Sequence, residues 1–169
     1  MTLFDVTVPQ LIKMLRNLDT WMAAAIAFAE RKKFDVNNLV KARLAPDQFA
    51  FDRQVQIACD NAKHIAARVT GRDVPVHADS ETTIEQLRAR IATVIAFLET
   101  FKVDDFTDAA ARKISLPWME GKWMRGEEYV AQLELPNFYF HVTTAYSILR
   151  HNGVELGKRD FIGGVPMRS

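Results

Sequence analysis

VPQLIKMLRNLDTWMAAAIAFAER, residues 8–31, carries the periodicity on which the fold prediction rests. Its apolar residues recur at alternating steps of four and three: Leu11, Leu15, Leu18, Met22, Ala25 and Ala29. This spacing places them on one face of an α-helix. Thr7 and Gln10 have the spacing of a capping box, and Pro9 falls in the first turn, where its missing N–H costs nothing. The segment therefore predicts a long amphipathic helix.

The same periodicity recurs in three later segments. Residues 46–70 form the first, which Pro46 opens and Gly71 ends. The second covers residues 80–102, and the third runs from Pro136 through Asn152. Glycine directly after a periodic segment is a frequent helix terminator, because it adopts a left-handed backbone without strain. Four amphipathic helices with shorter connections predict an all-α fold, a four-helix bundle.

The connection before the last helix is irregular. Residues 113–124 break the periodicity and read as a small hairpin, and residues 126–134 read as a short helix. Trp118 and Trp123 lie in this insertion, where they either pack on the rest of the chain or form a dimer contact. The prediction is a single helical domain over residues 1–169 with a small irregular or hairpin insertion between its third and fourth helices.

Composition excludes several classes of protein. Hydrophobic residues make up 49% of the 169 residues and charged residues 25%, so a disordered chain is not expected. The formal net charge is +1, which favours neither nucleic acid nor an anionic membrane as a partner. A single cysteine, Cys59, excludes an intramolecular disulfide and a four-cysteine zinc site. The acidic start and the absence of a long apolar run predict a cytoplasmic protein without signal peptide or membrane span.

Two histidines are candidates for chemistry. His64 follows Asp60 by one helical turn, a pairing found in metal and acid–base sites, although an exposed histidine with a helix neighbour has the same pattern. His141 falls inside the apolar stripe of the last segment, with Asn137 one turn before it. A buried imidazole needs a hydrogen-bond partner, so His141 is either a satisfied core residue or part of a site.

The chain resembles a known family in several stretches. Its last helix, PNFYFHVTTAYSILRHNG from Pro136 to Gly153, resembles the last helix of the DinB/YfiT-like superfamily, including the Leu-Arg-x-x-Gly ending. The whole chain resembles the DUF1993 family within that superfamily. The further matching stretches are Thr7–Pro9, Ala58–Asp60 with Ala62-Lys63, Gly126–Tyr129 and Gly157–Phe161.

The superfamily resemblance implies a four-helix bundle, often dimeric, and in many members a divalent metal held by three histidines. One of these histidines comes from the second helix and two come from the fourth, four residues apart. By position the first matches His64 and the last matches His141, but Asn137 stands at the third place. An amide oxygen binds zinc or nickel much more weakly than imidazole does. Asp60 is a possible additional ligand.

Two functions follow from this departure. The first is a small-molecule-binding or structural homodimer that lacks a complete three-histidine site. The second is a divergent metal-dependent enzyme, resembling thiol-dependent transferases, that would use His64 and His141 with a zinc or nickel ion. The apolar circumference of the last helix favours a homodimer. Neither a nucleic acid nor a membrane is expected as a partner.

Overall fold

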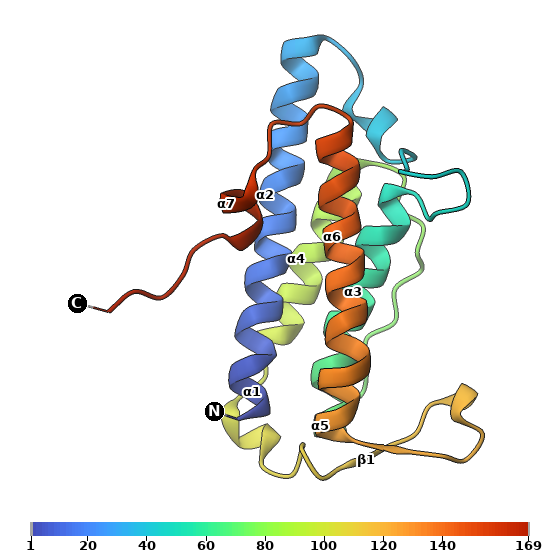
Figure 1. Ribbon diagram of the computed structural model, residues 1–169, viewed down its shortest axis with the longest axis vertical. Helices are drawn as coiled ribbons and strands as arrows, with labels where there is room; N and C mark the ends of the chain where they lie inside the picture. The colour runs from blue at the N-terminus through green and yellow to red at the C-terminus, as the bar shows by residue number, and fades with distance from the viewer. Residues whose placement is uncertain (1, 169) are drawn as a thin grey trace.

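The computed structural model describes residues 2–168, most of which are helical (Figure 1). The helices are α1 (Leu3–Val6), α2 (Val8–Lys32), η1 (Val36–Leu39), α3 (Phe51–Thr70), α4 (Ile84–Leu98), η2 (Val103–Phe106), η3 (Pro117–Met119), α5 (Gly126–Glu128), η4 (Tyr129–Glu134), α6 (Leu135–His151) and α7 (Lys158–Ile162). The strands β1 (Lys113–Ile114) and β2 (Met124–Arg125) form a two-stranded sheet. The helical class predicted from periodicity is therefore what the structure shows.

The long helices α2, α3, α4 and α6 lie side by side around one hydrophobic core (Figure 1). Helices α2 and α6 run in one direction, and α3 and α4 run in the other. Helix α3 packs against both α4 and α6, while α2 closes the other side. The apolar stripe of α2 is fully buried from Leu11 to Ala25, which is the face that its spacing predicts. None of the helices within residues 2–168 is long and apolar enough to cross a membrane.

Helix α3 begins at Phe51, five residues later than Pro46, where the sequence pattern placed its start. The preceding residues form a turn, and the connector supplies the acceptors for the first helical amides. The amide of Phe51 donates to the Ala42 carbonyl (2.9 Å), and that of Asp52 donates to the Val40 carbonyl (3.0 Å). Tertiary contacts therefore fix this helix start, and the prediction from proline was wrong.

The capping box predicted at Thr7 and Gln10 was also wrong. A short helix, α1, precedes Thr7, and the Thr7 hydroxyl donates back to the Leu3 carbonyl (2.5 Å) instead of capping α2. The observed capping box lies at the start of α1, where the Asp5 amide donates to the Thr2 hydroxyl (3.3 Å). The sequence pattern missed α1 because a four-residue helix is too short to show periodicity.

The chain from Gly126 to His151 is one continuous helix rather than two. Its middle, η4, is a π-helical turn that ends just before Pro136. Proline lacks an N–H and its ring crowds the carbonyl four residues earlier, so the helix passes this residue by widening the preceding turn. Gly126 begins the helix, and a Cβ there would overlap the carbonyl oxygen of Ala109.

The predicted hairpin is present and extends away from the helices (Figure 1). Strands β1 and β2 pair antiparallel, with Ile114 opposite Met124. Trp118 is 65% exposed and Trp123 is 50% exposed, and the Lys113 ammonium lies 4.6 Å from the Trp123 ring. Both tryptophans therefore lie at the surface of the hairpin and not in the core of the chain. A dimer contact stays a prediction.

Candidate functional site

A line of polar side chains lies between the antiparallel helices α3 and α6. On α3 they recur every seven residues, and Glu134 of η4 and His141 of α6 are likewise seven residues apart. Seven residues are close to two helical turns, so each set shares one face of its helix. We call this set the polar seam: Gln54, Asn61 and Arg68 of α3, Tyr129 and Glu134 of η4, and His141 of α6.

His141 and Gln54 form one end of the polar seam. Gln54 donates from Nε2 to the Phe49 carbonyl (3.0 Å), which leaves its Oε1 facing His141 Nδ1 at 2.7 Å. His141 therefore carries its proton on Nδ1 and keeps a lone pair on Nε2. The ring is 7% exposed, and burial followed by the charge of Arg53 lowers the pKa of His141 to about 4. His141 is thus a neutral imidazole at pH 7.

Arg68, Tyr129 and Glu134 form the other end. The Arg68 guanidinium donates to the Tyr129 hydroxyl (2.8 Å) and lies 3.6 Å from the Glu134 carboxylate. Tyr129 is fully buried and Glu134 is 5% exposed, whereas the Arg68 side chain is 30% exposed. A π turn bonds residues five positions apart, so it brings Tyr129 and Glu134 to one side of the helix.

Burial changes the acidity of this end of the seam. It raises the pKa of the Glu134 carboxyl, an effect that the Tyr129 hydroxyl and the Arg68 charge only partly offset. Burial also raises the pKa of Tyr129, and the nearby Glu134 charge adds to that shift. Glu134 is therefore easier to protonate than an ordinary glutamate and can accept a proton or a hydrogen bond.

Two atoms of the polar seam are buried without a hydrogen-bond partner among residues 2–168. They are Nδ2 of Asn61 and Oε2 of Glu134. Asn61 lies midway between Gln54 and Arg68 on the same face of α3. Gln54 contacts His141, and Arg68 contacts Glu134. Asn61 therefore also points toward the helix that carries His141 and Glu134. Buried polar atoms in native proteins nearly always have a partner. A polar ligand with one acceptor and one donor would supply the missing hydrogen-bond partners of both atoms.

His64 lies beside the polar seam but not near His141. It follows Gln54, the partner of His141, by ten residues, which is about 15 Å along the helix axis. Ligating nitrogens on one zinc ion lie within roughly 4 Å of each other. Burial, and then the Arg68 charge, lowers the pKa of His64 to about 4. The structure thus separates the two imidazoles along α3, although both are neutral and able to accept protons.

Asp60 belongs to another group of charges. Its carboxylate accepts from Lys63 Nζ and from Arg90 Nη2, both at 2.8 Å. Asn137 is half-buried on α6, between Glu134 and His141 on the same face. Within the described part of the chain, no group of three or more histidine, cysteine, aspartate and glutamate side chains is arranged to hold a metal ion.

Most residues of the polar seam were not among the candidates predicted from the sequence. Gln54, Asn61 and Arg68 flank the apolar stripe of α3 at a constant spacing of seven, a pattern visible in the sequence. Tyr129 and Glu134 could not be paired in the same way. In an ordinary α-helix, residues five apart point in different directions, and only the π turn aligns them.

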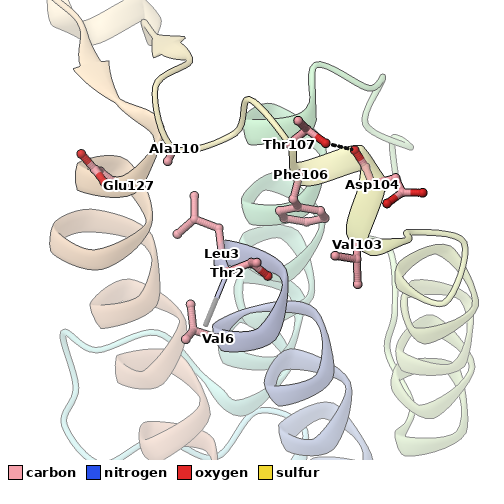
Figure 2. A pocket seen from close by; sticks show the side chains of 9 residues that line it. All are labelled: Thr2, Leu3, Val6, Val103, Asp104, Phe106, Thr107, Ala110 and Glu127. Atoms are coloured by element: carbon pink, nitrogen blue, oxygen red, sulfur yellow. Dashed lines mark hydrogen bonds between the residues drawn. The ribbon is translucent and has the colours of Figure 1, made fainter.

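A separate hollow of about 520 Å³ lies at the end of the molecule where α1, η2 and α5 meet (Figure 2). Figure 2 shows apolar side chains such as Leu3 and Phe106 beside this hollow, with the acidic Asp104 and Glu127 near it. The lining residues are Thr2, Leu3, Val6, Val103, Asp104, Phe106, Thr107, Ala110 and Glu127. None of them belongs to the polar seam.

Comparison with known proteins places the chain in a family. A solved structure, described as a DinB family member protein from Shewanella denitrificans, is 52% identical to it. That structure superimposes with a TM-score of 0.96 over 99% of this chain and 95% of the other. Among curated proteins, none matches significantly. The model of the family described as "Domain of unknown function (DUF1993)" matches residues 3–162, and the chain therefore belongs to the DUF1993 family.

Proposed function

We propose that this DUF1993 protein is a DinB-like four-helix bundle that binds a small polar molecule in its polar seam, without a three-histidine metal centre. The observation that carries the proposal is the pair of buried, unpartnered atoms, Nδ2 of Asn61 and Oε2 of Glu134. Leaving such groups unsatisfied costs about 1–3 kcal/mol each. A molecule that bonds to both recovers this free energy, and that recovery favours binding.

The surrounding residues define the chemistry of the ligand. Asn61 Nδ2 offers a donor and Glu134 Oε2 offers an acceptor, so the complementary ligand carries both an acceptor and a donor. A carboxamide or a hydroxyl group meets this requirement. Arg68 is the most exposed member of the seam, at 30%, so it stands where the seam meets solvent. The half-buried His64 lies one turn before Arg68 on α3, so it is placed to contact the outer part of the ligand.

Acetamide is the probe that tests the proposal. It carries a carbonyl acceptor and an amide donor in four non-hydrogen atoms, so its dissociation constant cannot be tighter than about 0.04 mM, and we expect millimolar binding. Titration into ¹⁵N-labelled protein should shift the side-chain amide resonances of Asn61 saturably. In Glu134→Gln the lost charged acceptor should weaken binding about tenfold or more.

Asn38→Ala is the matched control, because Asn38 is an exposed asparagine of η1 outside the polar seam. This variant should bind acetamide as the wild type does. The proposal fails if the Asn61 resonances do not respond, or if Glu134→Gln and Asn38→Ala respond to the same extent.

A further inference from the structure

The connection between α3 and α4 is held to the helices by side chains. We call residues 72–82 the strap. It contains no helix or strand, and it runs back along α3, so that α3 and α4 point the same way (Figure 1). Gln56 and Lys63 of α3 bond to the strap, whereas Gln54 and Arg68 face α6. The strap therefore covers a different side of α3 from the polar seam.

Lys63 anchors the middle of the strap. Its Nζ lies 2.9 Å from the Pro75 carbonyl, 2.7 Å from His77 Nδ1 and 2.8 Å from the Asp60 carboxylate. These contacts use all three hydrogens of the ammonium group. An ammonium group can only donate, so His77 Nδ1 accepts and the ring must be neutral. The Lys63 side chain is 2% exposed, so these three partners take the place of water around the ammonium group.

Arg90 of α4 anchors the end of the strap. Its Nη1 donates to Asp79 (2.7 Å) and Glu81 (3.0 Å) of the strap, and its Nη2 donates to Asp60 (2.8 Å). Arg53 adds a second bond to Asp79 (2.5 Å). Burial opposes ionisation of Asp79 and Glu81, but the hydrogen bonds from the arginines outweigh it and hold the pKa of each carboxyl below its ordinary value. The two anchors therefore respond differently to acid.

We propose that the strap is a pH-sensitive latch, in which protonation of His77 releases residues 74–78 from Lys63 while Arg90 keeps the far end attached. A protonated ring would lose its acceptor at Nδ1 and place two positive charges 2.7 Å apart. Lys63 is buried and is held on α3 by Asp60, so the more exposed partner, the strap, is the one that moves. The latch is independent of the function proposed for the polar seam.

The charges that face His77 come from both helices and from the strap. Lys63 and Arg90 disfavour its protonation, while Asp60 and Glu81 favour it. Burial and Lys63 prevail, and the pKa of His77 lies below its usual value of 6.5. The strap is therefore fully closed above pH 6.5, and it opens as the pH falls through the lowered pKa of His77.

Nuclear magnetic resonance tests the latch in the intact protein between pH 7.5 and 5. The imidazole resonances of His77 give its pKa, and the heteronuclear NOE of residues 74–78 reports the order of the strap. We expect both to change with one midpoint below 6.5. In His77→Gln, whose side-chain oxygen can accept from Lys63 but does not titrate, the strap should stay ordered at pH 5. His151→Gln, a change at an exposed histidine, should behave as the wild type.

A second variant distinguishes release of the strap by His77 from a general loosening of the protein in acid. Lys63→Met removes the ammonium group, so the pKa of His77 should rise toward 6.5 and residues 74–78 should be mobile at every pH. The proposal is overturned if His77 titrates while the strap stays ordered. It is also overturned if the strap loosens equally in His77→Gln, or if His77 stays neutral down to pH 5 with Lys63 in place.

Discussion

Replacing Arg90 with alanine should lower the free energy of unfolding by about 3–5 kcal/mol, the usual cost of removing one member of a buried ionic group. The Arg90 side chain is 1% exposed and is bonded to Asp60, Asp79 and Glu81. Its loss would leave three carboxylates facing one another with less compensating charge. Urea unfolding followed by circular dichroism measures the change.

Arg88→Ala is the matched control for this prediction. Arg88 also lies on α4 and also makes two bonds to a carboxylate, that of Asp19 (2.7 and 3.1 Å). Its side chain is 37% exposed, so its removal should cost only about 0.2–1 kcal/mol. A loss below 1 kcal/mol for Arg90→Ala would show that the strap and its anchors contribute little to the folded state.

Acid should destabilise the protein through His141. The pKa of this histidine is about 4 in the folded chain against 6.5 in an unfolded one, so the unfolded state takes up the proton first. The stabilisation is complete above pH 6.5 and is lost as the pH falls toward 4. The contribution of His141 over this range is at most about 3 kcal/mol, from 1.36 kcal/mol per pKa unit. Unfolding free energies measured from pH 7 to 4 follow this loss.

His141→Asn isolates that contribution. Asparagine can place an amide donor near the position of Nδ1, so the bond to Gln54 can persist while the titration disappears. The variant should be less stable at pH 7 and should lose about 3 kcal/mol less than the wild type between pH 6.5 and 4. His151→Asn, at the exposed end of α6, should not alter the slope. Equal slopes in His141→Asn and the wild type would contradict the assignment.

The helices could be predicted because a buried stripe repeats over many residues. The start and stripe of α2 and the stop at Gly71 follow from local spacing and backbone preference. The start of α3 could not be predicted, because carbonyls of the preceding connector, nine and twelve residues before the amides that they accept from, cap it. Pro136 was predicted to begin the last helix. The helix instead continues through Pro136, because a π turn lets the backbone pass a residue that usually stands in a first turn.

The candidate site was predictable only in part. The stripe position of His141 correctly indicated a buried imidazole that needs a partner, and the structure supplies Gln54. The spacing of Asp60 and His64 suggested that the two residues act as a pair. In the structure the Asp60 carboxylate is instead bonded to Lys63 and Arg90. Arg90 comes from α4, and spacing within α3 carries no information about that contact.

A crystal structure of protein purified without an affinity tag and soaked in acetamide, with anomalous data at the zinc and nickel edges, tests the proposed binding directly. We expect acetamide density bonded to Asn61 Nδ2 and Glu134 Oε2, and no anomalous peak beside His64 or His141. A cation at full occupancy coordinated by both histidines, with no acetamide in the polar seam, would contradict the proposal.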